Sequence, residues 1–386
     1  MNGNFTHMLG AVVAGIALTA SCVASAGAAG VAGLATRAPA SSAGQVPVTA
    51  YVASGLFHGK VTPIRTATNS ALPAIAVGSH PGPIAITPNG KTAYVIDSGG
   101  NHVTPIDTAT NRALPAIRVG ENPAAIAITP DGRTAYVASC ISDTVTPIRT
   151  ATRTALKAIK VGACPDAIAI SPGGTTAYVA DRGGARVTLI RTATNTVLKA
   201  IKVGSGPSAI AVTPDGKIVY VANYRSGTVT PIRAATRTAL RAIPVGGAPE
   251  AIAITPDGKT AYVVGRHHVT PIDTATNTAG PPINANQIFG VPYSESIAIT
   301  PDGTTAYVAD ADTSQVTPIS TATNTPLPAI PVGSAPEAIA ITPNGETAYV
   351  GVGLSLSIVV PIDTATNTVL PAITVPGGPR AIAITP

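Results

Sequence analysis

The sequence contains no tryptophan and only three phenylalanines, and aromatic residues make up 3% of it although 45% of its residues are hydrophobic. The 38 glycines and 36 prolines indicate many turns. This composition predicts short aliphatic segments joined by turns, which suits an all-β fold. The chain also lacks a nucleophile elbow, a phosphate-binding loop and a metal-ligand motif, so no motif indicates an enzyme.

Charge is absent from the stretch between Leu9 and Thr36, and Ala24–Ala26 fits the small-residue pattern that precedes signal-peptide cleavage. We therefore expect a signal peptide over residues 1–26, or as far as residue 35, and a secreted or cell-surface protein. The segment before Leu9 carries His7 where lysine or arginine is usual. Acylation at Cys22 and retention of the leader as an anchor are the alternatives. After the leader we expect a linker over residues 36–46 and a single domain over residues 47–386.

A repeat of about 42 residues runs through the chain, centred on a proline-containing turn. Each unit has four short apolar runs separated by turn residues, which is typical of a four-stranded β-propeller blade. Asn-Gly or Asp-Gly joins the first run to the second in most units and indicates a tight antiparallel hairpin. The repeated prolines are Pro88, Pro130, Pro172, Pro214, Pro256, Pro301, Pro343 and Pro386.

The two ends of the array complete each other. It begins at residues 49–52 with a second run and finishes at residues 381–385 with a first run. Pairing the C-terminal strand with the N-terminal three strands would close the ring and remove exposed edges. The sequence therefore predicts eight blades, with seven as the alternative.

Proline recurs inside the third run of every unit except one, which has Leu189 instead. Proline cannot donate a hydrogen bond to a neighbouring strand. We therefore expect the fourth strand to be short or bulged beside it.

Several segments resemble the YVTN-type β-propeller repeat: Tyr220–Asn223, Val332–Glu337 and Ile362–Asn367. The resemblance covers residues 49–386 in eight copies. It implies a propeller that is exported or displayed on a prokaryotic surface, in a family of which most members have no assigned activity. Similar propellers include lactone hydrolases and proteins that bind DNA or other partners. Alanine mostly stands here where the motif often has threonine after Tyr-Val.

The position just before each first run varies between units, unlike the residues around it. If these side chains meet at the channel mouth, their carboxylates could bind Ca²⁺ or a basic ligand group. The alternative is a set of solvated loop carboxylates. The ligand-binding candidates are Asp166, Glu250, Glu295, Glu337 and Arg380.

Histidine and cysteine are placed in loops of the same predicted face. His58, His80 and His102 form a weak candidate for a transition-metal site, because no ligand spacing repeats. Cys140 and Cys164 lie in neighbouring loops, and in an exported protein such a pair predicts a disulfide if the α-carbons come within about 7 Å.

Positive charge is concentrated between Val145 and Val245. This segment contains 14 Lys and Arg but only 3 Asp, whereas the whole chain has a net charge of +6. This basic sector follows the third and fourth runs and would lie on the outer and lower rim. It could bind an anionic polymer, a lipid surface or nucleic acid; the scarcity of aromatic residues disfavours nucleic acid. A solvated rim is the alternative. The basic sector comprises Arg149, Arg153, Lys157, Lys160, Lys199, Lys202, Arg233, Arg237 and Arg241.

These observations favour a non-catalytic, exported β-propeller that acts as a binding or scaffold module for a protein or an anionic polymer. A lactonase-like hydrolase with a site at the channel mouth is the second hypothesis. It requires a channel-mouth glutamate or a histidine within hydrogen-bonding reach of another polar group in one pocket. A self-associating surface-layer component is the third.

Overall fold

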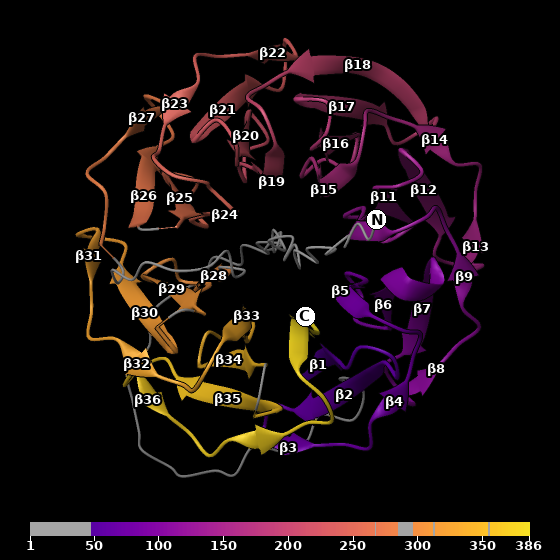
Figure 1. Cartoon of the computed structure of the whole chain (residues 1–386), viewed down its shortest axis with the longest axis vertical. Helices are drawn as coiled ribbons and strands as arrows, with labels where there is room; N and C mark the ends of the chain where they lie inside the picture. The colour runs from indigo at the N-terminus through magenta and orange to yellow at the C-terminus, as the bar shows by residue number, and fades with distance from the viewer. Residues whose placement is uncertain (1–47, 267, 285–295, 312, 354–355) are drawn as a thin grey trace, which may run out of the picture.

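The computed structural model describes residues 48–266, 268–284, 296–311, 313–353 and 356–386. The predicted leader, Cys22 and the linker lie outside these ranges. The chain forms an all-β, eight-bladed propeller, as the repeat predicts (Figure 1). The described residues contain no helix with the length and apolar character needed to span a membrane.

Four successive strands form each blade, from the channel outward. The innermost strands of blades 1 to 8 are β38 (Pro379–Ile384), β5 (Pro81–Ile86), β10 (Pro123–Ile128), β15 (Pro165–Ile170), β19 (Pro207–Val212), β24 (Ala251–Ile254), β28 (Ser296–Ile299) and β33 (Pro336–Ile341). The second strands are β1 (Thr49–Ser54), β6 (Thr92–Asp97), β11 (Thr134–Ser139), β16 (Thr176–Asp181), β20 (Ile218–Asn223), β25 (Thr260–Gly265), β29 (Thr305–Asp310) and β34 (Thr347–Val352). The third strands are β2 (Lys60–Arg65), β7 (His102–Asp107), β12 (Thr144–Arg149), β17 (Arg186–Arg191), β21 (Thr228–Arg233), β26 (His268–Asp273), β30 (Gln315–Ser320) and β35 (Ile358–Asp363).

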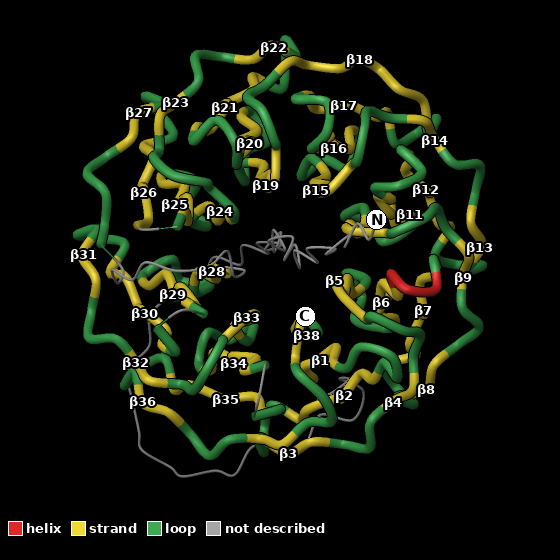
Figure 2. The backbone as a smooth tube through the Cα atoms, viewed as in Figure 1, coloured by secondary structure: helices red, strands yellow, loops and turns green. Residues whose placement is uncertain are grey.

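The outermost strand is split into two short pieces in most blades, as Figure 2 shows around the rim. The pieces are β3 (Ser70–Ala71) and β4 (Ile75–Ala76), β8 (Arg112–Ala113) and β9 (Ile117–Arg118), β13 (Thr154–Ala155) and β14 (Ile159–Lys160), β22 (Thr238–Ala239) and β23 (Ile243–Pro244), β27 (Thr278–Ala279), β31 (Thr325–Pro326) and β32 (Ile330–Pro331), and β36 (Thr368–Val369) and β37 (Ile373–Thr374). Blade 4, which has Leu189 in place of proline, instead has one unbroken strand, β18 (Thr196–Lys202). The effect expected of the prolines is therefore confirmed.

The ring closes through blade 1, where the C-terminal strand β38 pairs antiparallel with β1 (Figure 1). Two hydrogen bonds extend this pairing: Thr49 N–H donates to Thr385 Oγ1 at 2.9 Å, and Thr385 N–H donates to the Thr49 carbonyl at 3.0 Å. The predicted closure is confirmed, and it leaves neither strand with a free edge at the junction.

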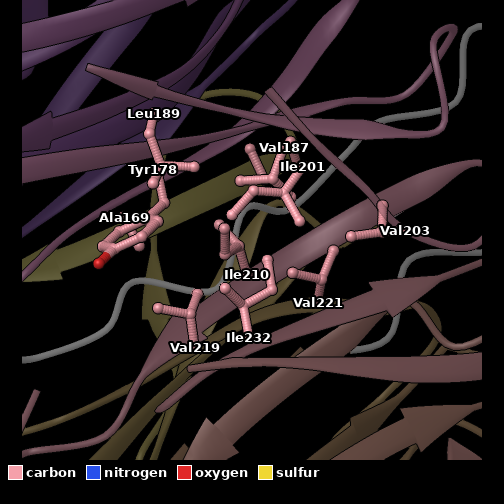
Figure 3. Packing of buried hydrophobic residues seen from close by; sticks show 12 residues of the cluster. Ala169, Tyr178, Val187, Leu189, Ile201, Val203, Ile210, Val219, Val221 and Ile232 are labelled. Carbon is pink, nitrogen blue, oxygen red and sulfur yellow. The ribbon is translucent and has the colours of Figure 1, made fainter. Parts of the chain in front are cut away.

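Apolar layers between adjacent blades form the core. Between blades 4 and 5, for example, Tyr178 and Leu189 pack in one cluster with Val219 and Ile232 (Figure 3). The hairpins at the lower ends of the first and second strands turn through glycines such as Gly132, whose φ is 69°. Asp131 accepts a hydrogen bond from the Arg133 amide at 3.0 Å there, so the Asp-Gly pair acts as predicted.

Two faces result from this connectivity. We call upper the face with the loops after the second strands and the links between blades; the Arg182 amide, for instance, donates to the Cys164 carbonyl at 2.9 Å. We call lower the face with the hairpins and the turns after the third strands. These two meet where Thr108 Oγ1 donates to the Gly90 carbonyl at 2.6 Å. The only 3₁₀ helix in the described residues, η1 (Ser98–Gly100), is an upper loop (Figure 2).

Candidate functional site

The basic sector lies on the lower turns and the outer strands of blades 3 to 5, and all nine of its side chains are exposed. Lys199 Nζ is 3.5 Å from the Arg237 carbonyl, so the cations of blades 4 and 5 are neighbours. Arg191, which the sequence analysis did not single out, has the same position in its blade as Arg149 and Arg233. The repeat register is the signal that would have found it.

The residue that ends the third strand differs between sectors of the ring. In blades 2, 6 and 8 it is Asp107, Asp273 or Asp363. Asp107 Oδ1 accepts hydrogen bonds from both the amide and the hydroxyl of Thr110 at 2.8 Å, and these bonds lower its pKa. Arginine has no acceptor for such a bond. Blades 3 to 5 therefore have an arginine where blades 2, 6 and 8 have a capping carboxylate. Blade 1 also has an arginine there, Arg65, and blade 7 has Ser320.

A second position in the same blades also carries a cation. In blades 1, 2, 6, 7 and 8, a proline lies between the two short outer strands or in the equivalent place. Blades 3 to 5 have Lys157, Lys199 and Arg241 there. The other five blades have Pro73, Pro115, Pro281, Pro328 and Pro371. The cations therefore follow the blade repeat across three adjacent blades.

At a third position, blades 3 and 5 have an arginine where the other blades have an asparagine, with the same backbone conformation. In the other six blades, an asparagine with φ between 49° and 56° ends the lower turn. In all six, the asparagine Oδ1 accepts a hydrogen bond from the buried tyrosine of the preceding blade, as Asn195 does from Tyr136 at 2.6 Å. Arg153 and Arg237 have φ values of 55° and 54° and cannot accept this bond.

In the described residues, none of the nine cations of the basic sector forms an ion pair with a carboxylate, although the charge of Arg153 helps to lower the pKa of Asp107 in the preceding blade. Four ion pairs form within the described part of the chain: Arg133–Asp131, Arg182–Asp166, Lys217–Asp215 and Lys259–Asp257. None involves the nine residues of the basic sector. Because neighbouring cations that form no ion pairs raise the local positive potential, this surface attracts anions.

The channel-mouth candidates are only partly solvated. Asp166 is 4% exposed, and its Oδ2 is 3.0 Å from Arg182 Nη1. Burial raises the pKa of Asp166, and the Arg182 charge partly offsets this. Burial also raises the pKa of Glu337, which the charge of Arg380 partly offsets. The alternative of solvated loop carboxylates is thus wrong for Asp166, which is buried and paired with Arg182.

The predicted metal sites find no support in the described residues, where no three His, Cys, Asp or Glu side chains gather closely enough to hold an ion. His58, His80 and His102 therefore do not form a metal-binding group; the His80 ring instead makes an edge contact with Phe57, with centroids 5.6 Å apart. Glu295 lies outside the described residues, so the complete glutamate set with Glu250 and Glu337 cannot be placed.

A disulfide joins Cys140 to Cys164, whose α-carbons are 3.8 Å apart. It connects the upper loop of blade 3 to the link that leads into blade 4. The Cys164 carbonyl also accepts the hydrogen bond from the Arg182 amide. The disulfide therefore supports the loop that carries Arg182.

The sequence matches the family described as "Lactonase, 7-bladed beta-propeller" over residues 147–243, from β12 to β23. None of the curated proteins matches the chain. The matched segment makes the chain similar to lactonase-type propellers over two blades, whereas its own ring has eight.

Solved structures of other proteins share the fold. Dihydro-heme d1 dehydrogenase NirN, in complex with DHE, is 15% identical with a TM-score of 0.72, covering 88% of this chain and 75% of that one. AztD from Citrobacter koseri, in its apo form, is 14% identical with a TM-score of 0.68, covering 87% and 97%. Hydrazine synthase from Kuenenia stuttgartiensis is 24% identical with a TM-score of 0.60, covering 78% and 97%. The names of the dehydrogenase and the synthase state different activities, and all three proteins are less than 25% identical to this chain, so the likeness concerns the propeller fold.

Proposed function

We propose that this protein is a non-catalytic, exported binding module whose basic sector docks on an anionic polymer with carboxylate or phosphate groups along its chain. The observation that carries the proposal is that cations stand at the positions of the capping aspartate and the proline in blades 3, 4 and 5, and at the position of the asparagine in blades 3 and 5. A general need for solubility would not require these changes to fall in the same blades. Exposed cations spaced along a rigid rim suit a ligand with regularly spaced negative charges.

The test measures binding of the purified chain to immobilised polygalacturonate and polyphosphate over a range of salt concentrations. The sector variant is Arg149→Gln, Arg191→Gln and Arg233→Gln. The matched control removes three exposed cations outside blades 3 to 5 that belong to none of the four ion pairs: Arg65→Gln, Lys91→Gln and Arg118→Gln. Arg65 has the same position in blade 1 as Arg149 in blade 3, so the control also tests whether that position alone is enough. We expect the sector variant to bind roughly tenfold to a hundredfold more weakly at low salt and to show a shallower salt dependence, because fewer counterions are released.

The control variant has the same net charge as the sector variant, so it separates a defined surface from overall charge. We expect its affinity to stay within about threefold of the unmodified chain, because scattered exposed charges act weakly at a distance beyond the Debye length. Equal losses in the two variants, or no saturable binding to either polymer, would contradict the proposal.

A lactone hydrolase is the second candidate, favoured by the family match over residues 147–243. Glu337 is the carboxyl group to test, because burial raises its pKa and a raised pKa suits a general acid or base. Hydrolysis of a six-membered sugar lactone can be followed by acid release at constant pH, for the unmodified chain and for Glu337→Gln. A rate equal to that of buffer would remove this candidate.

A further inference from the structure

Three large side chains occupy one repeated position on the upper face. Arg182, Tyr224 and Arg266 each follow the second strand of blades 4, 5 and 6, and they are spaced 42 residues apart. Their backbone amides donate to carbonyls of the links between blades, at 2.9, 2.8 and 3.3 Å. The repeat therefore places the three side chains in adjoining blades at the same height.

The same position in the other five blades is occupied by smaller residues. Those residues are Gly55, Ser98, Cys140, Ala311 and Gly353. The propeller can therefore form its upper loops with small side chains at this position. The bulky group in blades 4 to 6 is not required by the fold, and it lies on the opposite face from the lower turns of the basic sector.

The three side chains form one connected group. The guanidinium carbons of Arg182 and Arg266 each lie 5.7 Å from the centre of the Tyr224 ring. Arg266 Nη2 donates to the Tyr224 hydroxyl oxygen at 2.6 Å. Tyr224 belongs to the blade between the other two, so one ring is shared by two cations.

Arg182 is held from the other side by a buried carboxylate. Its Nη1 atom donates to Asp166 Oδ2 at 3.0 Å, and Asp166 is 4% exposed. The side chain of Arg182 is one-third exposed, so it remains accessible from solvent. Asp166 balances one of the two arginine charges, which leaves a net positive charge beside the ring, and Arg225 adds another exposed cation next to Tyr224.

We propose that Arg182, Tyr224 and Arg266 form a binding site for a small molecule that carries two anionic groups. Each guanidinium has five N–H donors in a planar fork, which suits a carboxylate or a phosphate oxygen pair. Each guanidinium carbon lies 5.7 Å from the same ring centre, so the two cations are no more than about 11 Å apart, and the two ends of one ligand can each face a guanidinium group. The positions of the two guanidinium groups are fixed by Asp166 and Tyr224 before binding, so little side-chain entropy is lost when the ligand binds.

The test is calorimetric titration of the disulfide-intact chain with pyrophosphate and with succinate, using acetate as a monovalent comparison. We expect saturable binding of one ligand per chain for at least one dianion. We expect at least tenfold weaker binding in Arg266→Gln, and partial recovery in Arg266→Lys. Tighter binding of pyrophosphate supports a phosphate ligand, and tighter binding of succinate supports a dicarboxylate.

Two controls make the test specific. Arg186→Gln removes an exposed arginine in blade 4 outside the group, and its affinity should stay within about twofold. The sector variant Arg149→Gln, Arg191→Gln and Arg233→Gln should bind the dianion unchanged, so failure of the polymer proposal does not affect this one. Arg182→Gln leaves Asp166 buried without its partner and must therefore be checked for folding, whereas Arg266→Gln affects an exposed side chain.

The proposal would be overturned if neither dianion gives saturable heat up to about 10 mM, since dissociation constants beyond that correspond to negligible affinity. It would also be overturned if Arg186→Gln weakens binding as much as Arg266→Gln does. That second result would mean that the dianion responds only to net charge.

Discussion

Blades 3 to 5 and blades 6 to 8 share one backbone plan but use their lower turns differently. In blades 6 to 8, each turn ends in an asparagine whose Oδ1 accepts a hydrogen bond from the tyrosine of the preceding blade. The three bonds are Tyr220–Asn277 at 2.8 Å, Tyr262–Asn324 at 2.5 Å and Tyr307–Asn367 at 2.6 Å. In blades 3 and 5, Arg153 and Arg237 replace the asparagine.

This difference predicts that blades 3 and 5 of the basic sector are locally less stable than the blades that have the asparagine. A residue with positive φ is less costly as asparagine than as arginine, and the arginine also removes a hydrogen-bond acceptor. Proteins break such local rules mainly at functional sites. The four predictions below test where the sectors differ, beginning with the largest expected effect.

The largest difference concerns the buried end of the second strand. Blade 4 has Asp181 there, whereas blades 6 and 8 have Gly265 and Val352. The Asp181 side chain is 0% exposed; its Oδ2 accepts a hydrogen bond from Thr188 at 2.6 Å, and its Oδ1 has no partner. Burial raises the pKa of Asp181 to about 7.

Because the folded-state pKa of Asp181 is above the unfolded value of 3.8, the protonated form favours the fold. Its contribution to the free energy of unfolding is complete below pH 4 and is lost as the pH rises towards 7, by about 4 kcal/mol. We expect Asp181→Asn to remove this loss. Urea unfolding at pH 4, 5.5 and 8 measures it; identical pH slopes in the two proteins would count against the assignment.

Asparagine is a suitable replacement because blade 5 already has Asn223 at this position. Its Nδ2 donates to Thr230 Oγ1 at 2.9 Å, the counterpart of the Asp181–Thr188 bond. Asp97 in blade 2 provides a second case: burial raises its pKa to about 6, so Asp97→Asn should remove a smaller part of the pH dependence, about 3 kcal/mol.

The disulfide gives the next effect. Cys140–Cys164 closes a loop with a sequence separation of 24, whereas the upper loop of blade 8 is held to its link by the Gly353 amide and the Ala335 carbonyl at 3.2 Å. Cys140→Ser with Cys164→Ser should lower the free energy of unfolding by about 3 kcal/mol, through a freer unfolded chain. Thermal unfolding with and without reductant measures this, and reductant should leave the double variant unchanged.

The third prediction converts blade 5 to the pattern of blade 6. Arg237→Asn supplies an acceptor for the Tyr178 hydroxyl and a residue better suited to a φ of 54°. We expect the free energy of unfolding to rise by about 1–2 kcal/mol and the affinity for the anionic polymer to fall. A gain in stability with no loss of affinity would show that Arg237 is not part of the docking surface.

The reverse change in blade 6 is the matched control. Asn277→Arg removes the acceptor for Tyr220 and places arginine at a φ of 56°. We expect it to lower the free energy of unfolding by about 1–2 kcal/mol. If both substitutions change stability in the same direction, the cause is not the Tyr–Asn bond.

The fold could be predicted from the sequence because its signals are local and repeated. Hydrophobic period and turn residues indicated the eight blades, and the incomplete units at residues 49–52 and 381–385 indicated the closing strand. The split outer strand follows from the missing N–H of proline. The blade with Leu189 in place of proline has an unbroken outer strand, which supports this reason.

The candidate sites were harder to predict because they depend on contacts between blades. Asp166 was a ligand-binding candidate with a solvated loop carboxylate as the alternative, but it is buried and forms an ion pair with Arg182, which is 16 residues away. The regular spacing of Arg182, Tyr224 and Arg266 was present in the sequence, yet side-chain reach across blades is not encoded in a single repeat. The repeat period therefore identifies which residues occupy equivalent loop positions. Which of these side chains are buried, paired or exposed depends on packing between blades.

The smallest expected difference lies between two buried tyrosines in neighbouring blades. Tyr136 donates to Asn195 Oδ1 at 2.6 Å, whereas the Tyr178 hydroxyl has no hydrogen-bond partner among the described residues, since Arg237 stands at the equivalent turn position. Tyr136→Phe should therefore lower the free energy of unfolding by about 1 kcal/mol, and Tyr178→Phe should change it by less than about 0.5 kcal/mol. Urea unfolding at one pH measures both. Equal losses would mean that Tyr178 has a partner that Arg237 provides or admits, and the stability cost assigned to arginine in the basic sector would then have to be reduced accordingly.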